Sequence, residues 1–332
     1  MTDTPTTSDH CAFVRSDGSH CSGRPAEEPD RALCFWHDPE VSKETDDVRK
    51  LLEAWADTGE SMEGFILRYA RLEGLHLSNR RSRDMRGAIL FRANLQGSSL
   101  FNLDLREADL SKANLAGANL NESQMSSVNL LGANFDGTRL ERVDWGGPCT
   151  NETAARTALR EGRHDEASSC FEEAEEVYRI LRRAYDGAGR FEQAGAFFRR
   201  EMTMRRMLLP RFSGARFWSK LVDLFCAYGE SPPRVILSAT LLNVVIAFLF
   251  FFAGVNGPDG ALCVDLSQGF WVNCEMYLNC LYYTVVTFTT LGYGEITPAT
   301  LFTRHLASTH AFAGAFMMAM FVTVFGKKMT RG

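Results

Sequence analysis

The distribution of apolar positions divides the chain into two parts. Residues 1–220 are polar and rich in charge, whereas two long apolar runs follow, at 235–255 and 306–325. A helix of about 20 residues, with a rise of ~1.5 Å per residue, spans the ~30 Å hydrocarbon core of a bilayer. We therefore predict two membrane-spanning helices, at 235–255 and 305–326.

Basic residues predict the orientation of these spans. Lys and Arg are frequent before the first span, and Lys327 and Lys328 follow the second, whereas residues 254–303 contain neither. Cytoplasmic loops of membrane proteins carry an excess of Lys and Arg. We therefore expect a multi-pass plasma-membrane protein with both termini in the cytoplasm. The first ten residues are polar and do not have the pattern of a signal peptide.

The segment between the two spans is too short to cross a bilayer and too apolar for a free external loop. Residues 275–289 have the composition of a helix, and a glycine-containing strand follows at once. That strand consists of Thr290, Leu291, Gly292, Tyr293 and Gly294. Over residues 234–328 the chain resembles the pore domain of potassium channels, whose filter signature is T-V-G-Y-G.

The resemblance implies how the strand would work. Potassium channels replace the hydration shell of K⁺ with stacked rings of backbone carbonyls, and glycines permit the positive φ angles that aim these carbonyls at one axis. Tyr293 is expected to pack against the pore helix. Because one chain holds one strand, the resemblance implies a homotetramer with potassium ions in the filter.

Three further positions fit the same family. Tyr282 and Tyr283 occupy the place of an aromatic pair that supports the filter, and Glu295 replaces the usual Asp after it. We expect the Glu295 carboxylate to meet the Tyr283 hydroxyl.

The second span contains candidate gating residues. Gly314 lies 20 residues after Gly294, where potassium channels carry a hinge glycine, although a small residue also lets membrane helices pack closely. Phe321 and Phe325 lie one turn apart near the cytoplasmic end. They are candidates for an inner gate, and lipid-facing positions are the alternative.

Two cysteines, Cys263 and Cys274, flank the predicted external turret. Exported segments meet an oxidising environment, so these two residues are candidates for a disulfide.

A repeat with a period of five occupies residues 85–146. Each repeat carries a large apolar residue, with a smaller residue usually two positions before it, as in Ala113-Asn114-Leu115. Neither the 3.6-residue period of a helix nor the two-residue period of a strand gives this spacing. The segment resembles the pentapeptide-repeat family, which implies a right-handed quadrilateral β-helix with four repeats per coil. We expect residues 46–84 to form a helical lead-in.

The N-terminal region, 1–45, contains a candidate metal site. Its four residues are Cys11, Cys21, Cys34 and His37, which match a tetrahedral Cys3His set for structural zinc. So short a segment has little apolar content, so metal would supply its folding energy. His10 and His20 are alternative ligands, and free cytoplasmic thiols are the alternative to a metal site.

Two segments link the repeat to the pore. Residues 150–210 predict helical hairpins of the tetratricopeptide kind, with a plain helical spacer as the alternative. Residues 214–230 predict an amphipathic helix that lies against membrane lipid, with a plain linker helix as the alternative.

These patterns predict a multidomain membrane protein that combines a zinc knuckle, a β-helix, a helical linker and a tetrameric two-helix pore. The leading interpretation is a potassium-selective channel gated through its cytoplasmic domains by a ligand or protein partner. The alternatives are a weakly selective cation channel and a membrane-tethered scaffold. No catalytic set of residues stands out, so we do not expect an enzyme, and the net charge of -5 argues against nucleic acid as the main partner.

Overall fold

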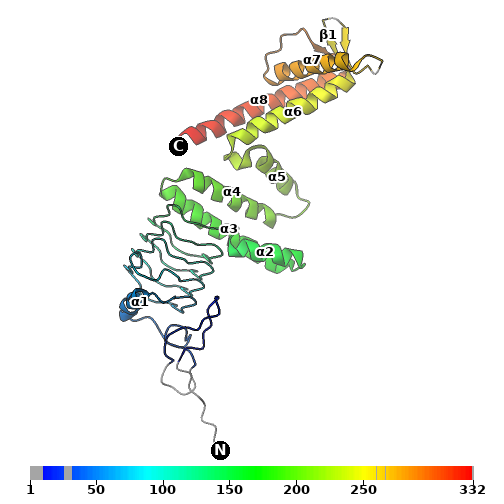
Figure 1. The fold of residues 1–332 in the computed structure, drawn as a ribbon. Helices are drawn as coiled ribbons and strands as arrows, with labels where there is room; N and C mark the ends of the chain where they lie inside the picture. The colour runs from blue at the N-terminus through cyan, green and yellow to red at the C-terminus, as the bar shows by residue number, and fades with distance from the viewer. Residues whose placement is uncertain (1–9, 26–31, 259, 266, 331–332) are drawn as a thin grey trace, which may run out of the picture. The chain divides into compact units, whose positions relative to one another are not determined.

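The computed structural model describes residues 10–25, 32–258, 260–265 and 267–330 (Figure 1). The chain divides into two compact units, Met1–Arg216 and Phe217–Gly332, and each is described by itself. Residues 1–9 and 26–31, which belong to the predicted zinc knuckle, lie outside the described residues.

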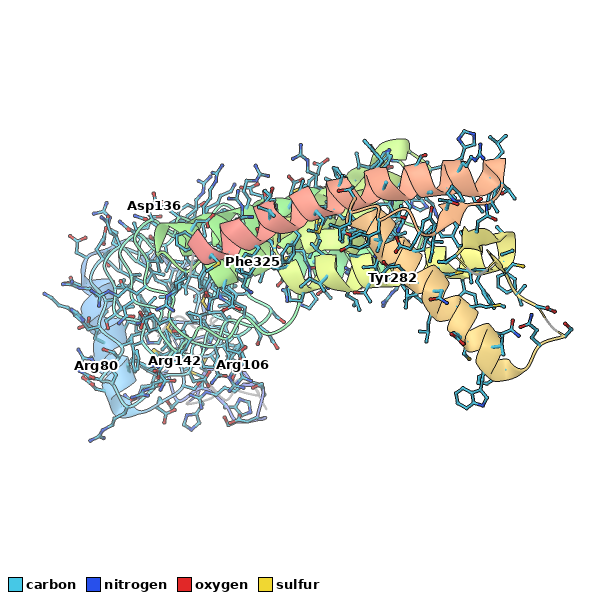
Figure 2. All side chains as sticks on the ribbon, turned by 90° about the horizontal axis from the view of Figure 1, so that it is seen from above. Arg80, Arg106, Asp136, Arg142, Tyr282 and Phe325 are labelled. Carbon is cyan, nitrogen blue, oxygen red and sulfur yellow. The ribbon has the colours of Figure 1, made fainter. Side chains whose placement is uncertain are left out.

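The centre of the first unit is a β-helix of stacked coils (Figure 1). Parallel bridges join residues 20 apart, such as Asn94 to Asn114 and Asn114 to Asn134. Twenty residues are four pentapeptides, so four repeats make one coil. The large apolar residues of the repeats form the interior, where Leu110 and Leu120 are fully buried. Charged side chains such as Arg80, Arg106 and Arg142 project from the outside of the coils (Figure 2).

The prediction of a helical lead-in over 46–84 is wrong beyond Thr58. Helix α1 covers only Asp47–Thr58, and residues 62–77 already form a coil of the β-helix. The bridge from Ile66 to Ile89 spans 23 residues instead of 20. An insertion near residues 80–82 interrupts the five-residue period and hides the first repeats in the sequence.

Three helices cover the C-terminal end of the β-helix. They are α2 (Thr150–Arg160), α3 (His164–Gly187) and α4 (Phe191–Leu208). The Trp145 indole donates to the Tyr185 hydroxyl at 2.8 Å, and the Cys149 backbone N–H donates to the Tyr178 hydroxyl at 3.0 Å. One hydrophobic core runs through coils and helices alike. The helical segment therefore shields the last coil, whose strands would otherwise be an open edge.

The second unit consists of packed helices with one short sheet at one end (Figure 1). Its elements are most of α5 (Gly214–Cys226), η1 (Ala227–Gly229), α6 (Pro232–Ala253), β1 (Val255–Gly257), β2 (Gly260–Leu262), α7 (Phe270–Phe288), β3 (Thr297–Pro298) and α8 (Leu301–Thr330). The antiparallel sheet has the order β2-β1-β3. Helices α6 and α8 are long and apolar enough to cross a membrane, and α7 packs against both.

Helix α5 leaves its apolar side chains uncovered. Phe217, Trp218 and Leu224 are each more than 60% exposed, and within α5 only Cys226 is buried. An amphipathic helix with an open aromatic and aliphatic face suits the membrane interface.

Candidate functional site: pore loop and metal cluster

The segment after α7 has an alternating backbone. Gly292 and Gly294 have φ angles of 58° and 90°, and Thr290 also has a positive φ, of 59°. Leu291 and Tyr293 between them are not among the positive-φ residues. Alternation between left- and right-handed φ turns successive carbonyls toward the same side of a strand. The two glycines were expected at such positions, whereas Thr290 was not, because no rule of residue type predicts a threonine at positive φ.

This strand is open along its whole length. Leu291 is 62% exposed and Tyr293 is 68% exposed, and the other three residues of 290–294 are exposed as well. Among the described residues of one chain the Tyr293 ring stays largely exposed, so the expectation that it packs against the pore helix remains a prediction for an assembly of several chains.

The residue that supports Glu295 is Tyr282 and not Tyr283. The Tyr282 hydroxyl donates to the Glu295 carboxylate. Tyr283, one position on, points to the other side of α7, where its ring lies 5.0 Å from that of Phe250 on α6. Adjacent helical residues are about 100° apart around the axis, so only one of the two tyrosines can face the loop after the filter.

Gly314 lies at a close contact between two helices. A Cβ atom at this position would lie 2.1 Å from the Phe288 carbonyl oxygen, at the end of α7. No side chain fits there. This contact is a sufficient reason for glycine, and it favours the close-packing interpretation over a free hinge.

The two candidate gate residues stack on each other, with ring centroids 5.6 Å apart. Phe321 packs toward a small cluster that contains Cys226, Val235 and Val324. Phe325 is 46% exposed. Of the two, Phe325 is therefore the more open to a pore lumen, to lipid or to another chain.

The predicted disulfide is not formed. Cys263 and Cys274 are both free thiols and both partly exposed. Cys263 instead lies beside Gly254 at the end of α6, where a Cβ on that glycine would be 3.6 Å from the Cys263 Cβ.

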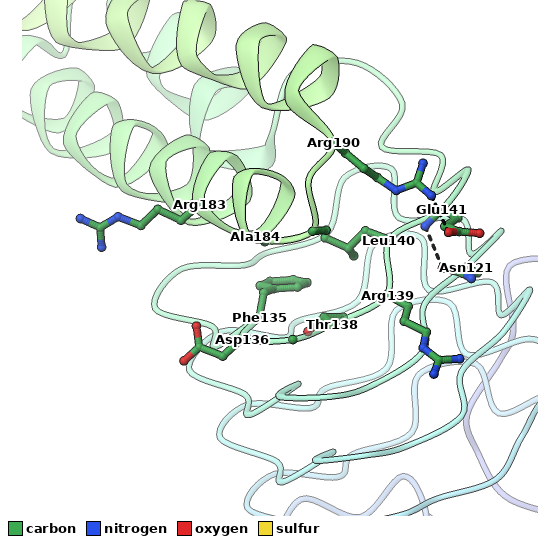
Figure 3. A pocket seen from close by; sticks show the side chains of 13 residues that line it. Asn121, Phe135, Asp136, Thr138, Arg139, Leu140, Glu141, Arg183, Ala184 and Arg190 are labelled. Atoms are coloured by element: carbon green, nitrogen blue, oxygen red, sulfur yellow. Dashed lines mark hydrogen bonds and ion pairs between the residues drawn. The ribbon is translucent and has the colours of Figure 1, made fainter. Parts of the chain in front are cut away.

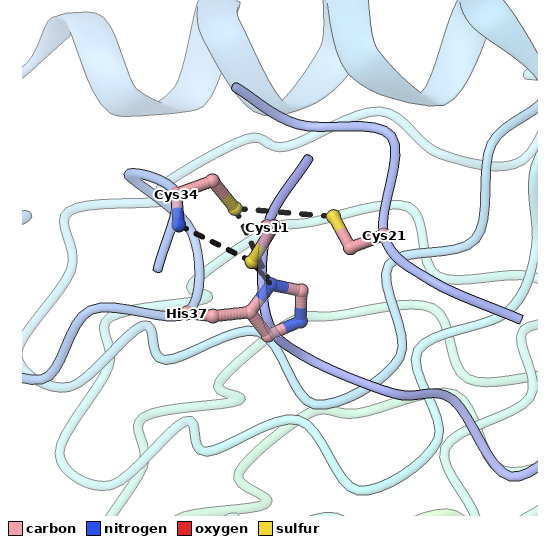
Figure 4. Close-up of side chains that lie close together, drawn as sticks. All are labelled: Cys11, Cys21, Cys34 and His37. Atoms are coloured by element: carbon pink, nitrogen blue, oxygen red, sulfur yellow. Dashed lines mark hydrogen bonds between the residues drawn. The ribbon is translucent and has the colours of Figure 1, made fainter. Parts of the chain in front are cut away.

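The four predicted metal ligands converge at one buried point (Figure 4). The Cys21 and Cys34 sulfurs are 3.9 Å apart, and the His37 Nδ1 lies 3.6 Å from the Cys11 sulfur and 3.3 Å from that of Cys34. Zinc–sulfur and zinc–nitrogen bonds of ~2.3 and ~2.0 Å give tetrahedron edges of about 3.8 and 3.5 Å. The cluster therefore fits a tetrahedral metal ion, and neither His10 nor His20 belongs to it.

Neighbouring groups orient the ligands. The His37 Nε2 lies 2.9 Å from the Glu63 carbonyl oxygen, so it carries the proton and leaves Nδ1 for a metal. The His37 ring stacks on Phe13 at 3.8 Å. A Cβ on Gly23 would lie 2.9 Å from the Cys34 Sγ, so this position requires glycine. Since Glu63 belongs to the first coil, the cluster is tied to the β-helix.

The thiols are arranged for deprotonation. The hydrogen bond from the Cys34 thiol lowers the pKa of Cys21 to about 4, and the same bond raises the pKa of Cys34. A lowered thiol pKa favours the thiolate, which is the form that binds metal.

Two protein families match separate parts of the chain. A family described as ion channel matches residues 240–331, and pentapeptide repeats match residues 104–142 in eight copies. The chain carries a two-span ion-channel domain and a pentapeptide-repeat domain. No curated protein matches the chain.

Two solved structures that are similar to part of this chain are described as pentapeptide-repeat proteins. Rfr23 from the cyanobacterium Cyanothece 51142 is 33% identical, and the match covers 26% of this chain and 54% of Rfr23, with a TM-score of 0.20. The protein alr5209 from Nostoc Pcc 7120 is 31% identical, with 28% and 74% covered and a TM-score of 0.23. This chain spans about half the length of Rfr23.

A hollow of about 540 Å³ lies between the last coil and α3 in the first unit (Figure 3). Its lining includes Arg139 from the coil and Arg183 from α3, both exposed. Arg190 pairs with Glu141 at 2.5 Å along the same wall. The lining carries charge of both signs, since Asp136 and Glu141 also belong to it, and the Arg139 and Arg183 side chains point in different directions (Figure 3).

Proposed function

We propose that this protein is a subunit of a homotetrameric potassium-selective channel. The observation that carries the proposal is the alternating, exposed strand 290–294 between α7 and α8. Its open carbonyls can replace the water of a dehydrating K⁺ ion when several such strands face one another.

The incomplete ion site and the exposed apolar side chains of one chain support an oligomer. A single strand cannot surround an ion, and Leu291 and Tyr293 lack cover within the chain. Large apolar side chains on α8, among them Phe312 and Phe316, are also more than 60% exposed. Four copies around one axis would close the carbonyl rings, and lipid would cover the outer surface.

The support around the filter has a defined chemistry. The Tyr282 hydroxyl bonded to Glu295 holds the end of the strand next to α7. The residue at 291 contributes its carbonyl to the filter, so Leu in place of Val changes little. A weakly selective cation channel is the second candidate, because Glu295 in place of Asp is the observation that favours a looser filter end.

The metal cluster is proposed to be a structural zinc site. Three sulfurs and one nitrogen form a closed set with no fifth position, which suits structure and not catalysis. When bound, zinc would hold Cys11, Cys21, Cys34 and His37 together and thereby fix the knuckle on the first coil.

We further propose that the first unit controls gating. In this proposal α6 and α8 cross the plasma membrane and the first unit lies in the cytoplasm. The basic residues before α6 and after α8 support this orientation. The regulator would be a cytoplasmic ligand or a protein partner that binds the first unit.

Purified full-length protein in liposomes tests the proposal. We expect flux that follows a K⁺ gradient, that Ba²⁺ blocks, and that Gly292→Ala abolishes because alanine resists the positive φ. Sodium flux of equal size would favour the weakly selective channel. Absence of any flux from folded tetramers would favour a membrane-tethered scaffold.

A further inference from the structure

A buried histidine lies inside the second membrane helix and has no role in the proposed filter. His310 is only 2% exposed, and its Nδ1 has no hydrogen-bond partner among the described residues. Ionisable side chains within membrane helices are costly, and those that persist commonly serve function. The contacts of this imidazole therefore indicate its role.

The other ring nitrogen contacts the pore helix. The His310 Nε2 lies 3.3 Å from the Thr284 carbonyl oxygen, and Thr284 is fully buried. Because a carbonyl can only accept, Nε2 carries the proton and donates it. The His310 ring also lies 5.6 Å from that of Phe288, the last residue of α7.

A second contact lies one helical turn further on both helices. Gly314 meets the Phe288 backbone so closely that a Cβ would lie 2.1 Å from the carbonyl oxygen. The pairs are thus His310 with Thr284 and Gly314 with Phe288, four residues apart on α8 and on α7. Two contacts on one face fix both the distance and the rotation of α7 against α8.

We propose that His310 is a positioning residue for the selectivity filter. Its Nε2–H holds the Thr284 carbonyl, and with Gly314 it fixes the last turn of α7. The filter strand begins two residues after Phe288, so the position of this turn sets where the strand starts. The inference rests on the proposed potassium-channel function and adds a residue outside the filter signature.

The test compares two histidines of the same helix. His310→Phe keeps a ring of similar size and removes the donor, whereas His305→Phe changes an exposed position of α8. His310→Gln restores an N–H donor. Each variant is purified as the full-length chain, and conduction in liposomes is followed as external K⁺ is lowered.

We expect His310→Phe to shift the ratio of conducting to non-conducting filters about threefold to tenfold toward the non-conducting state, as loss of one hydrogen bond predicts. High external K⁺ should offset the loss because bound ions hold the filter open. His310→Gln should recover most of the wild-type ratio, and His305→Phe should match wild type.

Gly314→Ala gives a second measurement, with Gly326→Ala as its control, since a Cβ at 326 meets nothing within 4 Å. We expect Gly314→Ala to lose conduction at low external K⁺ as His310→Phe does, and Gly326→Ala to conduct like wild type. The inference is overturned if wild type is K⁺-selective while His310→Phe, tetrameric and folded, conducts like wild type at every K⁺ concentration. If wild type itself does not select K⁺, the proposed function fails instead.

Discussion

At the scale of single residues, the pore loop depends on which side of a helix each side chain faces. Tyr282 and Tyr283 are adjacent and chemically identical, yet only Tyr282 reaches Glu295, while Tyr283 packs on Phe250. Sequence identified both as supports. The sequence-based expectation paired Glu295 with Tyr283 and was wrong, because adjacent residues lie about 100° apart around α7 and the packing of Tyr283 on Phe250 leaves Tyr282 on the side of Glu295.

The Tyr282 hydroxyl should stabilise the conducting filter. Tyr282→Phe removes a hydrogen bond to a charged acceptor, and such a bond stabilises more than one between neutral groups. Because this position is exposed, water replaces part of the stabilisation that the hydrogen bond provides. We therefore expect the rate at which open channels stop conducting to rise several-fold in single-channel recordings. Tyr283→Phe is the matched control and should leave this rate near the wild-type value. Equal acceleration by both variants would contradict the assignment.

At the scale of elements, both ends of the β-helix are closed by other structures. The cluster of Cys11, Cys21, Cys34 and His37 connects to the first coil through the hydrogen bond from His37 to the Glu63 carbonyl. At the other end, α2–α4 share a hydrophobic core with the last coil. Open β edges invite aggregation, so these covers keep the repeat soluble.

Removal of the metal should loosen the N-terminal cover first. We expect about one zinc per chain in wild type, and loss of that zinc in Cys34→Ser, because a tetrahedral site cannot spare a thiolate. Cys170→Ser, which lies outside the cluster, should keep the metal. Elemental analysis gives the stoichiometry.

Limited proteolysis then reports the structural effect. Cleavage within residues 10–40 should accelerate in Cys34→Ser and in chelator-treated wild type, while the later coils stay resistant. A metal-free wild type with an intact, protease-resistant knuckle would show that the cluster folds without zinc.

Sequence predicted the elements to different degrees. The five-residue period is visible because coil after coil repeats without insertions from Met85 onward. The earlier coil escaped detection, since the insertion near residues 80–82 shifts its register by three. The disulfide between Cys263 and Cys274 was predicted only from the oxidising environment of external loops. Residue spacing alone does not show where two side chains point.

At the scale of the whole molecule, all the proposed ion-handling parts lie within one unit. The filter, α7 and both spanning helices belong to Phe217–Gly332, and the metal cluster and the coils belong to Met1–Arg216. On the proposed function, this division predicts that the second unit selects ions without the first.

Deletion of residues 1–210 tests this separation. A cut inside the first unit, near residue 150, would strip α2–α4 of the core that they share with the coils. The complete deletion should leave K⁺ selectivity intact and change open probability, both measured in planar bilayers. An unchanged open probability would make the first unit an assembly or localisation module, and lost selectivity in a folded tetramer would contradict the separation.

The central claim is that strand 290–294 selects potassium. The most direct measurement is the reversal potential of the full-length channel in a planar bilayer with K⁺ on one side and Na⁺ on the other. A reversal potential far from zero, in the direction set by K⁺, is the predicted result. A reversal potential near zero would contradict the claim and identify a cation channel that does not distinguish the two ions.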